Sequence, residues 1–357
     1  MNDRRLSMEM ILNLERVFKA EKIREIKDSA PVFVIGSHRS GTSFLYRLIQ
    51  KYLKIGFGRD NGLFVRKMKM LNYYGDLKND ANLRRLLTDI LNEPDVKRRF
   101  PGLEIDVDVF ISQMDERTYP ELVRRFYAEW AYLKGADRWG GKTPDYSVYT
   151  AELLQLFPDA KFVHIIRDGR DVALSLFRLD WGAKSPIVAA KHWKERVEAA
   201  CNFGRTLDDS QYLEIRYEHL VQFPEEIFEN LIHFLDWEDD RYKIIDQFNR
   251  GIVGKVRRDN FNKWKTQMSR RHIRLFEQVA GKLLQNLNYK TIFSDEEISQ
   301  PLTKTQLAVD YLENILRKLL MGQGFKGLFV RSGKWMRKSI VKLRFLLNST
   351  SKALRIN

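Results

Sequence analysis

The chain has 357 residues, of which 44% are hydrophobic and 12% aromatic, so it can bury a large core and is not a disordered polymer. Its single cysteine, Cys201, excludes an internal disulfide framework and a cysteine-rich metal site. The net charge is +15, but residues 301–357 hold 12 Lys or Arg against Asp310 and Glu313, a local charge of +10. The body therefore lacks the concentrated basic face of a duplex-binding domain, and we expect no nucleic-acid partner.

Residues 1–28 have a helical pattern and form an expected N-terminal extension. This segment lacks the apolar core of a signal peptide, and no run of 18 uncharged apolar residues occurs in the chain. We therefore expect a cytoplasmic protein.

A short apolar run followed by a turn and a helical pattern occurs three times. The apolar runs are PVFVI at residues 31–35, KFVHII at 161–166 and QYLEIRY at 211–217. Strands that alternate with helices predict an α/β fold of three layers around a central parallel sheet. Residues 60–140 have a helical pattern and are expected to form a helical insert. This insert would lie on the side of the domain that receives a second substrate, the acceptor. We expect a main domain over residues 29–298 and a basic helical tail over 299–357.

The first turn, GSHRSGTSF at residues 36–44, nearly fits a phosphate-binding loop. Thr42 stands where a nucleotide triphosphatase places its lysine, and Arg39 lies inside the loop. Backbone N–H groups at such a turn, together with a helix N-terminus, favour an anion. The alternative is an ordinary turn that uses glycine for its left-handed conformation.

The second turn, RDGRDVALSLF at residues 167–177, places Arg167 at a strand end and Ser175 eight residues later. A guanidinium holds a dianionic phosphate by paired hydrogen bonds, and a serine hydroxyl adds a neutral donor. The alternative is a surface ion network at a helix N-cap, formed by Asp168, Arg170 and Asp171.

Over roughly residues 30–290 the chain resembles the sulfotransferases that use 3′-phosphoadenosine 5′-phosphosulfate, PAPS. The first turn resembles their P-loop-like 5′-phosphosulfate loop, in the form with arginine found in tyrosylprotein and related bacterial sulfotransferases. The second turn resembles their 3′-phosphate motif, which assigns Arg167 and Ser175 to the nucleotide. The resemblance implies a loop that binds the donor through Arg39, Ser40, Gly41, Thr42 and Ser43.

Three further segments resemble the same family. WGGKTPDYSVY at residues 139–149 makes Lys142 a candidate for the 5′-phosphosulfate, and an exposed loop charge is the alternative. EIRYEHLVQFPEE at residues 214–226 places Tyr217 near the nucleotide, with a core tyrosine as the alternative. The closing segment, residues 253–289, offers Lys255 or Lys263 for the 3′-phosphate, and Arg257 is a further candidate.

The general base is left open by the sequence. In the tyrosylprotein branch a carboxylate follows the first loop by about one helix, and Asp60 occupies that place here. His38 is the rival, because the ordinary pKa of imidazole suits proton transfer near neutral pH. Other carboxylates also remain candidates: Asp106, Asp108, Asp115 and Glu116.

The resemblance implies transfer of the sulfuryl group of PAPS to an acceptor hydroxyl, with Arg39, Asp60 and Lys142 as catalytic residues and without a metal. A glycan or glycolipid is favoured over a protein tyrosine as acceptor. The alternative is a P-loop kinase or nucleotide triphosphatase, or a non-catalytic binding module.

The basic tail also carries aromatic and aliphatic residues, among them Trp335, Ile340 and Leu343. Such a composition predicts peripheral association with an anionic membrane surface on the inner face. A solvated or partner-packed helix is the alternative.

Overall fold

The computed structural model describes residues 2–237, 240–252 and 256–321. Five short strands run through the described chain, and each of them is followed by helical structure. The strands are β1 (Val32–Ile35), β2 (Ile55–Gly58), β3 (Arg138–Lys142), β4 (Lys161–Ile166) and β5 (Tyr212–Arg216).

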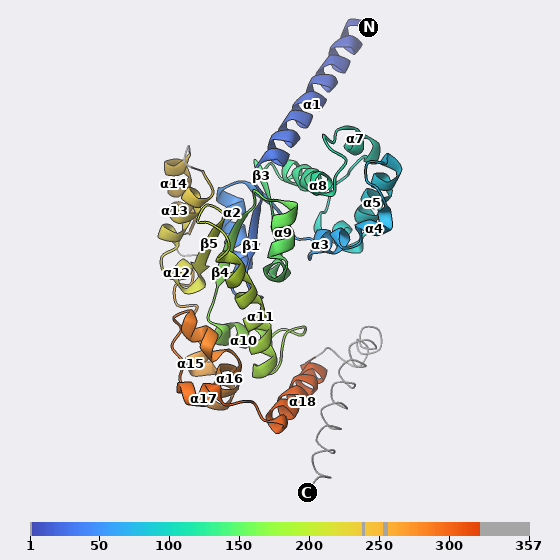
Figure 1. Ribbon diagram of the computed structural model, residues 1–357. Coiled ribbons are helices and arrows are strands. Elements are labelled where there is room, and N and C mark those ends of the chain that lie inside the picture. Colours follow the sequence, from blue (N-terminus) through green and yellow to red (C-terminus); the bar gives the residue numbers. More distant parts are fainter. Residues whose placement is uncertain (1, 238–239, 253–255, 322–357) are drawn as a thin grey trace. The chain divides into compact units, whose positions relative to one another are not determined.

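The helices of the described chain are mostly short (Figure 1). In chain order they are α1 (Asn2–Asp28), α2 (Thr42–Tyr52), α3 (Leu63–Met68), α4 (Leu71–Tyr74), α5 (Asp80–Asn92), α6 (Pro94–Arg99), α7 (Val107–Ser112), α8 (Tyr119–Leu133), the 3₁₀ helix η1 (Pro144–Val148), α9 (Thr150–Leu156), α10 (Gly169–Phe177), α11 (Pro186–Gly204), α12 (Tyr217–Gln222), α13 (Pro224–Phe234), α14 (Arg241–Ile252), α15 (Trp264–Gln267), α16 (Arg270–Asn286), α17 (Asp295–Ser299) and α18 (Lys304–Met321).

The strands form one sheet in the order β2-β3-β1-β4-β5, and every neighbouring pair is parallel. The predicted α/β class with a central parallel sheet is therefore confirmed. β1 and β4 are neighbours, with Ile35 paired to His164. Because parallel strands end at the same edge, the chain leaves both strands at one edge of the sheet.

The two faces of the sheet are covered by different helices. A Cβ built on Gly56 would meet Ala131 of α8, and one built on Gly58 would meet Tyr127 of the same helix. Phe57, between them, packs its ring 5.9 Å from Tyr46 of α2. Successive strand residues face opposite sides of a sheet, so α8 and α2 form the two outer layers. The predicted three layers are confirmed.

The predicted helical insert is present as α3 to α8, which follow β2 and precede β3 (Figure 1). Aromatic rings join it to the sheet, because Tyr127 of α8 stacks on Trp139 of β3 at 5.0 Å between centroids. Trp139 in turn lies edge-on to Phe33 of β1. These rings are buried, and burial of large apolar side chains is the main stabilising term of such a core.

The chain forms two compact units. The first unit holds residues 1–37, 41–166 and 199–259, including the whole sheet, and the second holds residues 38–40, 167–198 and those from 260 onward. The expected domain limits at residues 28/29 and 298/299 stay a prediction.

α18, in the second unit, turns polar residues inward. Asp310 accepts hydrogen bonds from Ser185 Oγ at 2.6 Å and from Ile187 N, and Asn314 accepts one from Lys184 N. Both α18 residues are buried. Exposed apolar side chains on the same helix are Val309, Leu312 and Leu316.

The tail is thus helical as far as Met321, and the residues on which the membrane prediction rests, 322–357, lie outside the described residues. In the ranges that the structure describes, no helix combines the length and the apolar character needed to span a bilayer.

Candidate active site

The loop after β1 has the backbone conformation of an anion-binding turn. Arg39 and Gly41 adopt left-handed φ angles of 69° and 102°, and Gly41 is the N-cap of α2. The turn begins at Gly36, whose N–H donates to Ser147 Oγ at 2.8 Å. The first N–H groups of a helix have no partner within it, so those of Thr42 and Ser43 start the helix as available donors.

Lys142 joins this loop from the end of β3. Its Nζ donates to Ser43 Oγ at 3.2 Å and lies 5.5 Å from the centre of the Tyr46 ring. The Lys142 side chain is 8% exposed, so it is not the exposed loop charge of the alternative interpretation. The first unit therefore brings together an ammonium group and a hydroxyl beside the start of α2.

Tyr217 begins α12 directly after β5 and lies against the same loop. A Cβ at Gly41 would come within 2.4 Å of the Tyr217 ring, so only glycine fits there without movement of the ring. Tyr217 is 6% exposed, which agrees with a packed ring. The expected place of Tyr217 near the nucleotide stays a prediction, and the structure shows its ring packed against the loop.

The second unit brings Arg39 next to the second turn. Arg39 Nε donates to Ser175 Oγ at 2.9 Å, and Arg167 Nη1 donates to the Arg39 carbonyl at 3.4 Å. Arg167 Nη2 donates to the Asn260 carbonyl at 3.0 Å. Arg39 is thus linked both to Arg167, which precedes α10, and to the hydroxyl of Ser175 near the C-terminal end of α10, and these residue types favour an anionic ligand.

Lys263 lies in the segment that touches Arg167. Its Nζ donates to Asn260 Oδ1 at 2.6 Å, and the carbonyl of the same asparagine accepts from Arg167. Lys263 is therefore the closing-segment candidate found beside Arg167. Lys255 lies outside the described residues, and Arg257 is exposed in the first unit.

A buried ion network supports the second turn. Arg170 pairs with Asp168 and with Glu277 of α16, each at 2.7 Å, and its guanidinium lies 3.5 Å from the centre of the Trp264 ring. Asp168 also accepts from Arg170 N and so caps α10. The alternative interpretation placed this ion network on the surface. That placement is wrong, because Arg170 is only 1% exposed.

Asp171 holds the closing segment against α10. Its Oδ1 accepts from Trp264 N at 2.9 Å, and its other oxygen lies 3.7 Å from Arg167. Burial raises the pKa of the Asp171 carboxyl, while the Trp264 N–H and Arg167 oppose this change. The sequence offered no sign of this positioning role, because Asp171 and Trp264 are 93 residues apart.

Asp60 is buried in the first unit. Its carboxylate accepts from Tyr146 Oη, from Gly62 N at 3.2 Å and from Phe64 N at 3.2 Å. Burial raises the pKa of Asp60, and these three hydrogen bonds oppose the shift. A raised pKa suits a general base, whereas an exposed fraction of 1% means that an acceptor reaches Asp60 only if the surrounding residues move.

The other candidate bases have structural neighbours. His38, in the second unit, packs its ring 4.9 Å from His192 and 5.5 Å from Trp181. Asp106 caps α7, Asp108 pairs with Arg84, and Asp115 pairs with Lys27, while Glu116 is exposed.

One cluster of potential metal ligands was not found from the sequence. The ligand atoms of His164, Cys201 and Glu214 lie within 4.8 Å of one another. Arg216 pairs with Glu214 at 2.8 Å, and burial together with the Arg216 charge lowers the pKa of His164 to about 3. A fixed guanidinium thus already neutralises the carboxylate that a metal would need.

The fold and these two groups of residues define an α/β protein with cationic and hydroxyl side chains at the turns after neighbouring parallel strands. The chain belongs to the sulfotransferase family, whose model matches residues 31–241. The predicted resemblance to sulfotransferases is therefore confirmed at the level of the family.

Two curated relatives are similar to this chain. An uncharacterised protein of Aquifex aeolicus (strain VF5) is 24% identical over 277 residues, covering 72% of this chain and 34% of the relative. A protein-tyrosine sulfotransferase of Drosophila melanogaster is 22% identical over 241 residues, covering 64% of this chain and 43% of that protein. The chain thus spans less than half the length of either relative.

Two solved structures are similar to this chain at low sequence identity. The sulfotransferase domain from the curacin biosynthetic pathway is 17% identical with a TM-score of 0.44, covering 73% of this chain and 98% of that domain. The sulfotransferase STF9 from Mycobacterium avium is 14% identical with a TM-score of 0.42, covering 75% of this chain and 80% of the other.

Proposed function

We propose that the protein transfers the sulfuryl group of PAPS to an acceptor hydroxyl, giving a sulfate ester and adenosine 3′,5′-bisphosphate. The observation that carries the proposal is the hydrogen bond from Arg39 Nε to Ser175 Oγ. It joins the loop assigned to the 5′ end of the donor to the motif assigned to its 3′ end. Because Arg39 of the first turn contacts Ser175 of the second, one ligand with negative charge at both ends fits the two turns together.

The donor set agrees with an anionic ligand. The side chains that would hold PAPS carry ammonium, guanidinium and hydroxyl groups: Lys142, Ser43, Arg39, Arg167 and Ser175. Bound PAPS would supply a sulfuryl group on its 5′-phosphate. Arg39 and Lys142 would neutralise the charge that develops on the oxygen between sulfur and phosphorus as that bond breaks, and such electrostatic stabilisation is commonly a large part of catalysis.

The acceptor oxygen would form its new bond to sulfur as the bond to the leaving phosphate breaks, and its proton would pass to a base. Asp60 is the preferred base because burial raises its pKa. In that role the Asp60 carboxylate would exchange the Tyr146 hydroxyl for the acceptor hydroxyl as hydrogen-bond donor. His38 remains the second candidate.

For the acceptor we propose a glycan or glycolipid hydroxyl in preference to a protein tyrosine. The support is the Lys142-Thr143-Pro144 segment, which resembles that of glycan sulfotransferases. Incubation of a cell extract with PAPS labelled with sulfur-35, followed by identification of the labelled product, tests this choice. Label in tyrosine of a polypeptide would contradict the preference and leave the reaction class intact.

Nucleotide binding tests the donor. Adenosine 3′,5′-bisphosphate should raise the melting temperature more than adenosine 5′-monophosphate, because only the former carries the group assigned to Arg167. Arg167→Ala should remove the difference between the two ligands, and Arg250→Ala, at an exposed ion pair with Asp246, should keep it. Equal shifts in the unaltered protein would remove the case for a 3′-phosphate site. A shift that requires ATP and Mg²⁺ would favour a kinase or nucleotide triphosphatase instead.

A further inference from the structure

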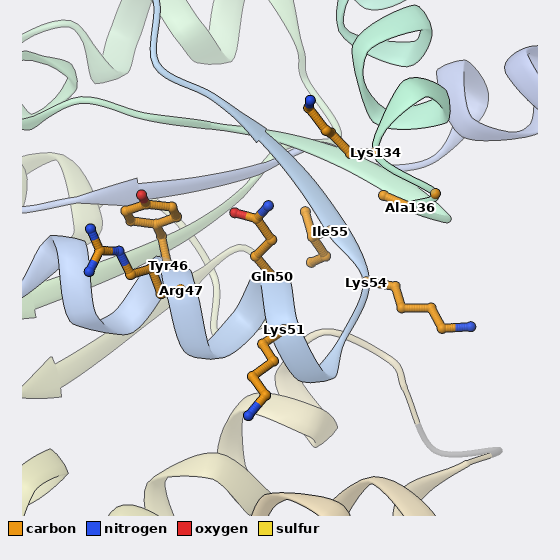
Figure 2. A pocket seen from close by; sticks show the side chains of 9 residues that line it. Tyr46, Arg47, Gln50, Lys51, Lys54, Ile55, Lys134 and Ala136 are labelled. Carbon is orange, nitrogen blue, oxygen red and sulfur yellow. The ribbon is translucent and has the colours of Figure 1, made fainter. Parts of the chain in front are cut away.

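A second basic site lies along α2, within the first unit. A pocket of about 550 Å³ opens there (Figure 2). Its lining comes from α2, from Lys54 after that helix, from the first residue of β2 and from the segment between α8 and β3: Tyr46, Arg47, Gln50, Lys51, Lys54, Ile55, Lys134, Gly135 and Ala136. Four of these nine residues are cations, and none is acidic.

The positive charge of the pocket is largely uncompensated. Lys54 lies 3.9 Å from Asp137, at an exposed position. Among the residues that the structure describes, no carboxylate comes within 4.0 Å of Arg47, Lys51 or Lys134. Lys51 and Lys134 instead lie over the rings of Tyr52 and Trp130. Like charges repel, and Figure 2 shows the Lys51 and Lys54 ammonium groups pointing apart.

The cations of this pocket are not those of the donor site proposed above, although the Tyr46 ring, which lines the pocket, also lies 5.5 Å from Lys142 Nζ. β2 begins at Ile55, and β3 begins two residues after Ala136. The pocket therefore lies where these strands start, whereas Lys142 and the loop after Ile35 lie where parallel strands end. Neither the fold nor the proposed transfer reaction uses its cations.

The lining indicates the chemistry of the ligand. Arg47 and Lys51 lie four residues apart on α2, about 6 Å along its axis, and Lys54 follows the end of the helix at Tyr52. Lysine ammonium groups act as point charges without a preferred plane, which suits tetrahedral oxyanions as well as carboxylates. The Tyr46 hydroxyl and the Gln50 amide add neutral donors near the buried Ile55.

We propose that this pocket binds a ligand with at least two sulfate or phosphate ester groups. Arg47 and Lys51 lie one turn apart on α2, Lys54 follows the helix and Lys134 comes from the segment before β3, so these cations meet groups several ångströms apart. One bound oxyanion would leave most of the four cations without a counter-charge, which is why we assign two or more ester groups to the ligand. This inference does not depend on the identity of the sulfuryl donor.

Titration calorimetry with the full chain tests the site with three probes: a sulfated heparin-type tetrasaccharide, inositol hexakisphosphate and an octaglutamate peptide. The double variant Lys51→Ala/Lys134→Ala should weaken binding of an ester ligand by about tenfold or more, since each lost charge contributes up to about a factor of five. The control Lys78→Ala/Lys243→Ala removes the same charge at exposed positions outside the pocket lining and should change Kd less than twofold.

If the tetrasaccharide binds more tightly than inositol hexakisphosphate, the ligand of the pocket is a sulfated glycan. If the inositol compound binds more tightly, the ligand carries phosphate esters. Both outcomes support the site. Equal weakening by the two double variants would show unspecific attraction and overturn it, as would the absence of binding to both esters below 1 mM. Tighter binding of octaglutamate than of both esters would mean that the pocket recognises carboxylates, and this result would also overturn the proposal. Arg47→Glu, a charge reversal at an exposed helix position, provides a second variant with the same expected direction.

Discussion

Arg39 Nε donates a hydrogen bond to Ser175 Oγ at 2.9 Å, although the two residues are 136 positions apart. Arg39 comes from the turn after β1 and Ser175 from α10, which follows the turn after β4. Because β1 and β4 are neighbours in a parallel sheet, the two turns start at the same edge. The contact connects the two sets of residues proposed to bind one nucleotide.

The two partners of this contact should differ in their effect on transfer. Ser175→Ala removes one neutral donor and should weaken binding of adenosine 3′,5′-bisphosphate by about 2- to 10-fold. Arg39→Ala removes charge at the proposed reacting group and should lower kcat by about 10²- to 10³-fold. Calorimetry and initial rates measure the two effects, with Ser112→Ala, an exposed serine of α7, as control. An unchanged affinity in Ser175→Ala would disprove its role at the 3′ end.

The pH dependence of transfer tests Asp60. A base acts when deprotonated, and burial raises the pKa of Asp60, so kcat/KM should rise with pH above the usual carboxyl range. Asp60→Asn should lower kcat by about 10²- to 10⁴-fold and abolish this acid limb. Glu104→Gln, at an exposed position, should leave the profile unchanged. If Asp60→Asn kept the rate and the acid limb, Asp60 would have a structural role only. His38 would then be the next candidate for the base.

Gly41→Ala should destabilise the protein through two effects. The φ of 102° is unfavourable for alanine, at a cost of about 1–3 kcal/mol, and the new Cβ would meet the Tyr217 ring at 2.4 Å. Gly102→Ala separates these effects, because Gly102 has a φ of 80° and no heavy atom within 4 Å of the added Cβ. Urea unfolding should show a larger loss for Gly41→Ala. Equal losses would mean that the Tyr217 ring moves away at little cost.

Removal of the negative charge of Glu277 should strongly destabilise the second unit. Its side chain is fully buried and accepts from Arg170 at 2.7 Å and from Phe293 N at 3.1 Å. Glu277→Gln leaves the buried Arg170 with one carboxylate, and we expect a loss of about 3–5 kcal/mol in the free energy of unfolding. Asp246→Asn breaks an exposed pair with Arg250 and should cost less than about 1 kcal/mol. Similar losses in both variants would contradict the assigned importance of burial.

His164 should make stability depend on pH in the acid range. Its folded-state pKa of about 3 lies below the unfolded value of 6.5, so the unfolded chain binds more protons between these values. Stability from this group is present above pH 6.5 and is lost as pH falls, by about 2 kcal/mol between pH 7 and pH 5. His164→Gln should reduce this slope in urea unfolding, and His219→Gln, at an exposed site, should not. An unchanged slope in His164→Gln would contradict the shift.

The sequence alone was sufficient for the fold class and for the positions of the two turns. Apolar runs such as Val32–Ile35, followed by glycine-bearing turns and helical patterns, are local features and can be recognised without knowledge of the fold. The residue types in the turns also indicated an anion, because arginine, lysine and hydroxyl side chains are donors wherever they lie.

The tertiary structure decided which of these residues meet. The contact between Lys142 and Ser43 spans 99 positions, and the burial of Arg170 depends on Glu277, 107 positions away. The basic pocket shows the same division: Arg47, Lys51 and Lys54 are close together in the sequence, but Lys134 joins them only after folding. Local patterns follow from backbone geometry over a few residues, whereas burial, pKa shifts and charge clusters depend on neighbours that the fold brings from distant parts of the chain.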